Sequence, residues 1–244
     1  DNDNAMVIDA KNIIEERFQK NSINLDIFKN KKVLDLGCGS GRYSVALGLL
    51  GAKEVIGVDW GDDGLQKGRD LAKDFGIKAQ FLKMSILELD FDDKSFDFIF
   101  CNGVTHHSES METATRELYR VLKDDGSAWY YVYGSGGWFW KILIHFNKFL
   151  KKVNIPKEYA MEVLKTIGMP ENRHIFIDHW YVPIQKNTSK ENFEIMLSDA
   201  GFNNNKRLPH GRNTDPDKFV KNRNDKDIEM WGDGDCNLRY MIKK

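Results

Sequence analysis

Hydrophobic and polar positions follow two alternating periods along residues 32–133. Short, mostly apolar runs suit buried strands, and between them apolar residues recur every three or four positions, as on one face of a helix. The runs predict strands at 32–36, 54–58, 79–83, 96–101 and 127–133. The periodic segments predict helices at 41–50, 62–75 and 110–122. Gly51 and Gly76 directly follow two of these helices and are typical C-terminal stops.

This order of elements predicts the fold. Strands that alternate with helices over short connections favour a doubly wound, mainly parallel α/β sheet of the Rossmann-like type. A helix at 189–200 and strands at 202–208 and 238–242 complete a predicted sheet of seven strands. Ligands of such sheets bind outside the carboxyl ends of the strands. Asp35, Asp59 and Asn102 fall at these ends, so we expect a ligand site there.

The regular pattern breaks after Tyr133, at a glycine-rich joint. Two predicted helices at 138–153 and 155–169 follow, rich in aromatic and basic side chains, before the sheet pattern resumes near residue 188. We therefore interpret the chain as four parts. These are an N-terminal helical segment (1–30), an α/β core (31–133), a helical and aromatic insert after the fifth strand that covers the substrate (134–187), and the C-terminal part of the core (188–244).

Composition and charge narrow the possible function classes. The 36 Lys and Arg residues nearly balance the 37 Asp and Glu, so no global field favours nucleic acid or an anionic membrane. No apolar run approaches the roughly 18 residues of a membrane-spanning helix. Cys38, Cys101 and Cys236 stand far apart, which suggests neither a disulfide framework nor a metal site. Without a secretory pattern at the start, we expect a cytoplasmic protein that holds no metal.

The most specific chemistry lies in residues 33–42, where an apolar run reaches Asp35 and then gives way to Gly37, Gly39 and Gly41. Glycine lets the backbone approach a ligand closely, because it has no Cβ. The spacing differs from that of a P-loop, which needs Lys and then Ser or Thr after its last glycine. It also differs from the Gly-x-Gly-x-x-Gly of dinucleotide folds. Phosphate is therefore not the obvious ligand.

Three motifs in this order resemble class I S-adenosylmethionine-dependent methyltransferases. They are Val-Leu-Asp-Leu-Gly-Cys-Gly-Ser-Gly-Arg at 33–42, Val-Ile-Gly-Val-Asp-Trp at 55–60 and Ser-Phe-Asp-Phe-Ile-Phe-Cys-Asn-Gly-Val at 95–104. The resemblance covers residues 30–133 well and the part after residue 188 more loosely. It implies a Rossmann-like fold, S-adenosylmethionine (SAM) as cofactor, S-adenosylhomocysteine as product and a small-molecule methyl acceptor.

The resemblance also implies which residues bind the cofactor. They are Asp35, Gly37, Gly39, Gly41, Asp59, Trp60, Met84, Ser85, Ile86, Asn102 and Gly103. The two carboxylate oxygens of Asp59 suit a ribose diol, and Trp60 can cover one face of the adenine. Asp35 can hold the ammonium of the cofactor. Members often have Asp where Ser85 stands, which removes a charge from the adenine edge. Helix-cap or turn roles for the two aspartates are the alternative.

His106 and His107 are the candidates for catalysis, because their loop borders the methyl end of the cofactor in the resembling family. A histidine there can deprotonate a hydroxyl or an amine. The alternative is that these side chains bond the backbone or cap the next helix. Tyr133, Trp180 and Tyr181 are predicted to line a substrate pocket, with ordinary core packing as the alternative.

The sequence therefore predicts an enzyme that moves the methyl group of SAM to O or N of a small-molecule metabolite. The basic segment 141–152 is interpreted as the solvated face of a helix rather than as a contact with RNA or a membrane. We expect no nucleic-acid or membrane partner, and the oligomeric state stays open. The alternatives are an RNA or protein methyltransferase and a non-catalytic SAM-binding regulatory protein.

Overall fold

The computed structural model describes residues 2–166, 181–210 and 237–244. Its centre is one sheet of seven strands in the order β3-β2-β1-β4-β5-β7-β6, which confirms the predicted α/β class. The first five strands run parallel, and β7 is antiparallel to both of its neighbours. The strands are β1 (Lys32–Leu36), β2 (Glu54–Asp59), β3 (Ala79–Lys83), β4 (Phe96–Asn102), β5 (Leu122–Tyr133), β6 (Asn204–Arg207) and β7 (Asn237–Lys243).

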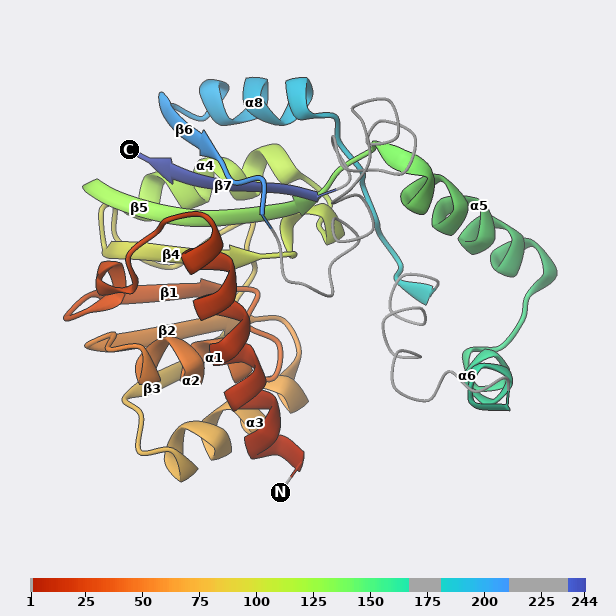
Figure 1. Cartoon of the computed structure of the whole chain (residues 1–244), viewed down its shortest axis with the longest axis horizontal. Helices are drawn as coiled ribbons and strands as arrows, with labels where there is room; N and C mark the ends of the chain where they lie inside the picture. Colours follow the sequence, from red (N-terminus) through yellow and green to blue (C-terminus); the bar gives the residue numbers. More distant parts are fainter. Residues whose placement is uncertain (1, 167–180, 211–236) are drawn as a thin grey trace.

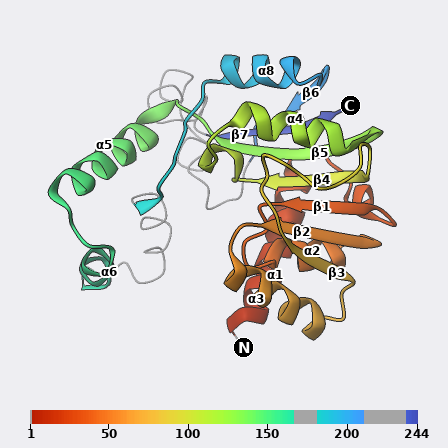
Figure 2. The ribbon, with the colours of Figure 1, turned by 180° about the vertical axis from the view of Figure 1, so that it is seen from behind.

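Helices cover both faces of this sheet, as Figures 1 and 2 show from opposite sides. Side chains of α1 and α2 pack with apolar residues of β1, β2, β4 and β5 on one face, and α3 packs against α2 and β3. Side chains of α4 and α8 pack on the other face. Alternate residues of each central strand therefore enter different cores. The helices are α1 (Asn2–Lys20), α2 (Arg42–Leu49), α3 (Asp62–Asp74), α4 (Met111–Val121) and α8 (Lys190–Asp199).

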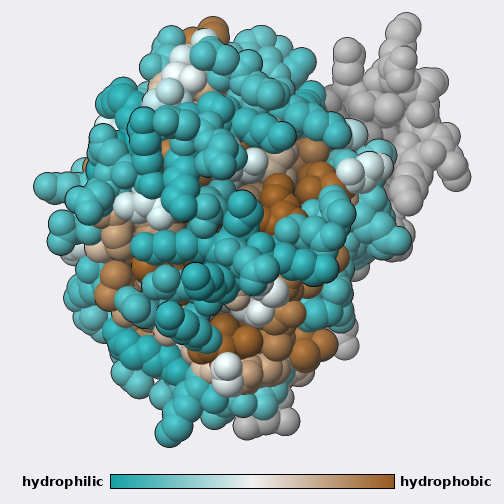
Figure 3. Space-filling view, turned by 90° about the vertical axis from the view of Figure 1, so that its left-hand side faces the viewer, coloured by the Kyte–Doolittle hydropathy of each residue, from teal (hydrophilic) through white to brown (hydrophobic). Residues whose placement is uncertain are grey.

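The strand order reverses beside β1, which lies between β2 and β4. The β1 strand leads into α2 on one face, and β4 leads into α4 on the other. The carboxyl ends of these strands meet at one edge of the sheet, and a crevice opens where such connections diverge. The surface of the molecule at the other edge, where the parallel strands have their amino ends, is mostly hydrophilic (Figure 3). The order of the strands thus predicts that a ligand site lies at the edge formed by the carboxyl ends of β1 and β4.

Most predicted element ends agree with the structure to within one or two residues. A clear difference is β5, which begins at Leu122 instead of at residue 127. The predicted end of the second insert helix, at residue 169, lies outside the described residues. Leu122 already pairs with Phe96, and the ladder then jumps to Phe98 and Ser127. Residues 124–126, between the predicted helix and the predicted strand, therefore lie at an irregularity inside β5. A short 3-10 helix, Leu25–Phe28, was not predicted and buries its last residue under the sheet.

The predicted insert contains α5 (Gly137–Val153) and α6 (Lys157–Thr166). Both helices stand away from the sheet, on the side of the carboxyl ends of β4 and β5 (Figures 1 and 2). The chain returns along residues 181–188 to α8, whose N-cap Ser189 accepts a hydrogen bond from the amide of Asn192 at 3.2 Å. The limits proposed for the four parts of the chain remain predictions.

Within the described ranges, no helix has both the length and the apolar character that crossing a bilayer requires.

Candidate functional site

The glycine turn after β1 is a wall of the candidate site. Gly37, Gly39 and Gly41 have φ values of +73°, +53° and +75°, a region that residues with a Cβ rarely adopt. A Cβ on Gly37 would lie 2.3 Å from a methyl carbon of Val104, so only glycine fits there. Apart from its two chain neighbours, no described residue has an atom within 4 Å of the position that a Cβ on Gly39 would take. The turn is therefore packed on one side and faces open space at Gly39.

Asp59, the last residue of β2, joins this turn to the next one. Its Oδ2 accepts the amide of Gly39 at 2.8 Å, and its Oδ1 accepts the amides of Trp60 at 2.7 Å and Gly61 at 3.1 Å. A carboxylate offers about four acceptor positions. Counting the contacts within the described part of the chain, one acceptor position on Oδ2 remains, next to Gly39.

The indole of Trp60 is 70% exposed, far more than is usual for this residue type. The ammonium of Lys83 lies 5.8 Å from the ring centre, and the same ammonium pairs with Asp62 at 2.5 Å. A large flat face thus stays open directly after Asp59. Such a face suits the stacking of a planar ring.

Asp35 lies inside the sheet rather than at its surface. The side chain is 3% exposed, and Ser44 Oγ donates a hydrogen bond to its Oδ2 at 2.6 Å. Burial raises the pKa of Asp35 from 3.8 to about 7, and the negative charge of Asp59 adds to the increase, against the lowering effect of the Ser44 hydrogen bond. The same burial raises the pKa of the neighbouring thiol of Cys38. Asp35 is therefore a buried acid that changes charge near neutral pH.

The segment after β3 holds the three residues predicted at the adenine edge. Met84 donates its amide to the carbonyl of Asp59 at 3.0 Å, which ties this segment to the end of β2. Ser85 Oγ accepts the amide of Leu87 at 3.1 Å, so the hydroxyl already stabilises a turn. Ile86 and Met84 pack at the border of the core that includes α4.

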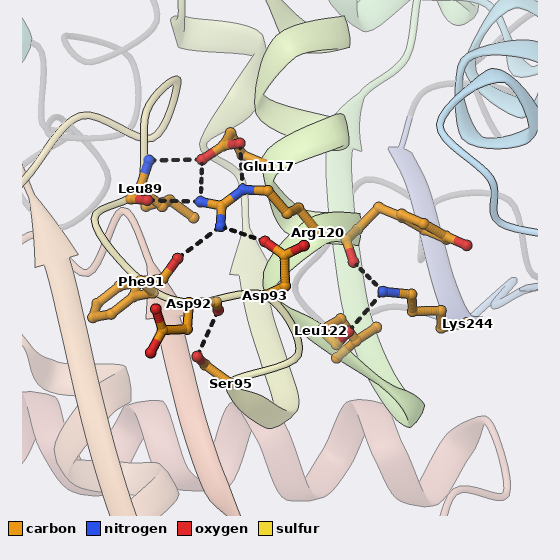
Figure 4. A network of polar contacts seen from close by, with 10 residues as sticks. Leu89, Phe91, Asp92, Asp93, Ser95, Glu117, Arg120, Leu122 and Lys244 are labelled. Atoms are coloured by element: carbon orange, nitrogen blue, oxygen red, sulfur yellow. Dashed lines mark hydrogen bonds and ion pairs between the residues drawn. The ribbon is translucent and has the colours of Figure 1, made fainter.

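Arg120, near the end of α4, lies beside this segment and contacts it (Figure 4). Its guanidinium donates to the carbonyls of Leu89 and Phe91, each at 2.7 Å, and pairs with Glu117 and Asp93. Glu117 in turn accepts the amide of Leu89 at 2.7 Å. The connection between β3 and β4 contains no helix, so these contacts from α4 supply its rigidity.

Asn102, at the end of β4, is held from two distant parts of the chain. Its Oδ1 accepts Nε1 of Trp129 at 3.0 Å and Nη1 of Arg17 at 3.3 Å. The guanidinium of Arg17 also lies 5.7 Å from the ring centre of Tyr131, and that of Arg239 lies 5.4 Å from it.

Sequence reasoning missed Arg17, Trp129 and Arg239 as neighbours of the site. The pattern around Arg17 is that of an ordinary amphipathic helix, and nothing in it indicates that α1 passes beside β4. Both arginines are buried, although such residues are seldom fully buried.

His106 and His107, after β4, lie together with Tyr133, the last residue of β5. The ring centres of His106 and Tyr133 are 3.8 Å apart, and those of the two histidines are 4.1 Å apart. His106 is fully buried, whereas His107 is half-buried. His107 Nδ1 lies 2.9 Å from the carbonyl oxygen of Ile184. A carbonyl only accepts hydrogen bonds, so this contact places the proton on Nδ1 and leaves Nε2 as an acceptor.

The returning segment 181–188 fastens this loop from outside. The amide of Lys186 donates to the carbonyl of His106 at 2.8 Å, and the amide of Ser135 donates to that of Thr188 at 2.9 Å. Tyr181 lies farther along, where its hydroxyl donates to the carbonyl of Ile155 at 3.0 Å between α5 and α6. Tyr133 and Tyr181 thus have different neighbours, and Trp180 lies outside the described residues.

Comparisons with known proteins bear on this arrangement. Residues 34–130 match a family model described as a methyltransferase domain. The chain is 30% identical to a sterol 24-C-methyltransferase of Candida albicans over 113 residues. This match covers 46% of this chain and 30% of that protein. It is also 35% identical over 96 residues to an uncharacterized methyltransferase of Bacillus subtilis, YcgJ. That match covers 39% of this chain and 38% of YcgJ.

The chain thus spans less than half the length of these curated relatives. The crystal structure of YcgJ superposes with a TM-score of 0.56 at 18% identity, over 93% of this chain and 98% of that chain. The [4+2]-cyclase SpnF gives a TM-score of 0.60 at 13% identity, over 96% and 81% of the two chains. Since a protein named for a cyclisation shares the fold, the fold by itself does not specify the reaction.

Proposed function

We propose that this chain transfers the methyl group of SAM to a small-molecule acceptor, because residues 34–130 match a methyltransferase domain model. One observation carries the proposal most directly. The Gly39 amide and the Asp59 carboxylate, 2.8 Å apart, bring the glycine turn and the end of β2 together beside open space. The donor and the acceptor both belong to this proposal.

The residues present fit the cofactor. The unused acceptor position on Asp59 Oδ2 is placed to receive a ribose hydroxyl, and the exposed ring of Trp60 can stack on the adenine. Asp35 lies under the glycine turn, where a carboxylate attracts the ammonium of the amino-acid part. Ser85 contributes no charge, and one acceptor position of its hydroxyl already receives the Leu87 amide, so the proposed adenine recognition rests more on Trp60 than on Ser85.

When bound, SAM supplies an electrophilic methyl group on a sulfonium. In the proposed reaction, His107 Nε2 receives the proton that a hydroxyl or amine loses as it takes up this group. The contact of Nδ1 with Ile184 fixes the tautomer that this role requires. His106 has its ring packed against Tyr133, so its proposed part is to position His107 and the loop. An acceptor without an acidic proton needs alignment only.

A small-molecule acceptor is supported by the relatives named sterol 24-C-methyltransferases. Their name specifies a carbon atom, whereas the sequence suggested O or N. The search for a product must therefore register methylated carbon as well. Labelled SAM incubated with a metabolite extract, followed by mass spectrometry for products heavier by one CH₂, covers all three atoms.

Calorimetric titration with SAM tests the donor site directly. We expect Asp59→Ala to weaken SAM binding by about tenfold or more, the scale of one or two lost charge-assisted hydrogen bonds. Asp62→Ala is the matched control, because Asp62 is a nearby exposed acid that pairs with Lys83 instead of facing the glycine turn. Absence of SAM binding at millimolar concentration refutes the proposal. Binding without transfer to any extract fraction favours the non-catalytic alternative.

The role of His107 has its own test. We expect His107→Ala to slow transfer to a hydroxyl or amine by about 10²-fold or more while leaving SAM affinity unchanged. A His107→Gln variant retains a side chain that can contact Ile184 but supplies no base. Equal activity of His107→Gln and the unsubstituted protein rules out proton transfer by this residue.

A further inference from the structure

Helix α5 presents an apolar stripe to solvent. Ile142, Phe146, Phe149 and Val153 recur at spacings of four, three and four residues, which places them on one side of the helix. They are 60%, 39%, 52% and 45% exposed. Such a stripe on a helix usually faces a core. Among the side chains of α5 that the structure describes, the buried one is Leu150, roughly a quarter turn away from the stripe.

Basic residues follow one flank of this stripe. Lys141, Lys148 and Lys152 each precede a stripe residue by one position, so they project to the same side of it. All three side chains are exposed, and Lys151 adds a fourth positive charge to the helix. The helix Gly137–Val153 contains no acidic residue. Apolar and positive surfaces thus lie next to each other along α5, in a protein whose overall charge is close to neutral.

The end of α5 is held in a defined conformation. Asn154 caps the helix in the left-handed region at φ 52°, and its amide bonds back to carbonyls of the last turn. The hydroxyl of Tyr181 donates to the carbonyl of Ile155, which ties the corner between α5 and α6 to the returning segment. On α6, Tyr159 and Val163, four positions apart, are also exposed. The apolar surface therefore belongs to an ordered pair of helices.

We propose that α5 is a docking element for an anionic lipid surface, with its apolar stripe entering the headgroup region and its lysines meeting lipid phosphates and carboxylates. An amphipathic helix with a pronounced apolar side, and with basic residues beside aromatic and aliphatic ones, is the kind that lies in a bilayer interface. Each lysine near such a surface adds attraction, and the stripe adds the burial of apolar area. The basic segment then has a partner that the charge balance of the whole chain did not suggest.

Two other occupants fit the same surface less well. A second copy of this chain would bring two lysine-rich flanks together, which is unfavourable. RNA would neutralise the lysines, but a stripe of Ile, Phe, Phe and Val offers its phosphates nothing. Of these three occupants, a lipid surface is the one that uses both the apolar stripe and the lysines of α5.

The position of α5 gives the proposal a consequence for the candidate site. The helix begins four residues after Tyr133, at the edge of the sheet where the strands β4 and β5 end (Figure 1). A bilayer under α5 would lie near the acceptor side of the site, so an apolar acceptor could enter from the lipid. This consequence depends on the proposed methyl transfer, whereas lipid binding itself does not.

Sedimentation with vesicles tests the docking without any cofactor. The probes are vesicles of phosphatidylcholine alone and of phosphatidylcholine with about one third phosphatidylserine. We expect the full chain to sediment with the second kind and only weakly with the first. The double variant Ile142→Asp/Phe149→Asp is expected to reduce this binding by about tenfold or more. Lys148→Glu/Lys152→Glu is expected to reduce it as well and to remove its dependence on salt.

The matched control is Ile195→Asp, because Ile195 is 57% exposed on α8, a helix outside the proposed surface. Its binding to vesicles should equal that of the unsubstituted chain. Circular dichroism checks that each variant keeps its helices. Equal binding by the control and by Ile142→Asp/Phe149→Asp overturns the proposal. Two further results overturn the proposal if the unsubstituted chain does not bind vesicles. One is a dimer that the double variant Ile142→Asp/Phe149→Asp abolishes, and the other is salt-sensitive binding to tRNA. SAM titration of the same variants separates failure of docking from failure of the proposed function.

Discussion

Replacing Asp35 with asparagine tests the electrostatics of the glycine turn. The side chain is buried, and its only described hydrogen-bond partner among side chains is Ser44, whose Oγ lies 2.6 Å from Oδ2. Asparagine has nearly the same shape and keeps an oxygen that can accept this hydrogen bond. The substitution therefore removes the ionisation of residue 35 and little else.

The magnitude follows from the raised pKa of Asp35. Burial, with the charge of Asp59, moves the pKa from 3.8 in an exposed carboxyl to about 7 in the folded chain. The folded state therefore holds the proton more tightly than the unfolded chain does, and the contribution of Asp35 to stability declines as pH rises from about 4 to about 7. At one pKa unit per 1.36 kcal/mol, the full cost of ionisation is ~4 kcal/mol, of which ~2.5 kcal/mol develops between pH 5 and pH 8.

Urea unfolding of both proteins at pH 5, 6, 7 and 8 measures this cost. We expect Asp35→Asn to gain stability relative to the unsubstituted chain by ~2.5 kcal/mol more at pH 8 than at pH 5. Asp97→Asn is the control. Although burial raises the pKa of Asp97, its hydrogen bonds with Lys123 and the Lys32 amide keep that pKa below 3.8, so its stability difference should not change over this range.

SAM binding should respond in the opposite direction. If Asp35 holds the ammonium of the cofactor, affinity for SAM rises with pH through about 7 in the unsubstituted chain. Asp35→Asn is then expected to bind SAM about tenfold more weakly at pH 8 and to lose this pH dependence. A stability difference between the two proteins that stays constant from pH 5 to pH 8 would refute the assignment of a raised pKa to Asp35.

Two further predictions concern the stability of the site, measured as urea-unfolding free energies. Gly37→Ala should lower the free energy of unfolding by about 2–4 kcal/mol, because its Cβ would overlap Val104 and its φ is positive. Gly76→Ala, at a residue with a positive φ but open space, should lower it by about 1 kcal/mol. Equal losses of stability in the two variants would contradict the steric argument. Arg120→Ala should lower the free energy of unfolding by about 1–2 kcal/mol, because two loop carbonyls lose their donor. Lys94→Ala breaks an exposed ion pair and should have no measurable effect. An equally large loss of stability in Lys94→Ala would argue against a stabilising role of the Arg120 contacts.

Much of the core was predictable from local pattern. The strands of the core are buried on both faces, so they appear in the sequence as short apolar runs, and their ends are marked by Asp35, Asp59 and Asn102. The prediction that Gly51 and Gly76 end helices is confirmed, because both have a positive φ. These features depend on a few consecutive residues, which is why sequence reasoning reached them.

The prediction failed where two distant segments decide the outcome together. The early start of β5 depends on the pairing of Leu122 with Phe96, a contact that the helical pattern around residue 122 concealed. The same holds for Arg17, which reaches Asn102 across 85 residues of chain. The burial of His106 depends on Tyr133 and on the returning segment that bonds its carbonyl.

The sequence by itself determined the order of strands and helices, the glycine turn and the acidic ends of β1 and β2, because each is encoded by short-range periodicity and by residue type. Only the tertiary structure decided that Asp35 titrates near neutral pH, since its pKa depends on burial by surrounding elements. Only the tertiary structure decided, too, that the apolar face of α5 meets solvent. A spacing of three and four residues describes a buried stripe and an exposed one equally well, and packing against other elements distinguishes them.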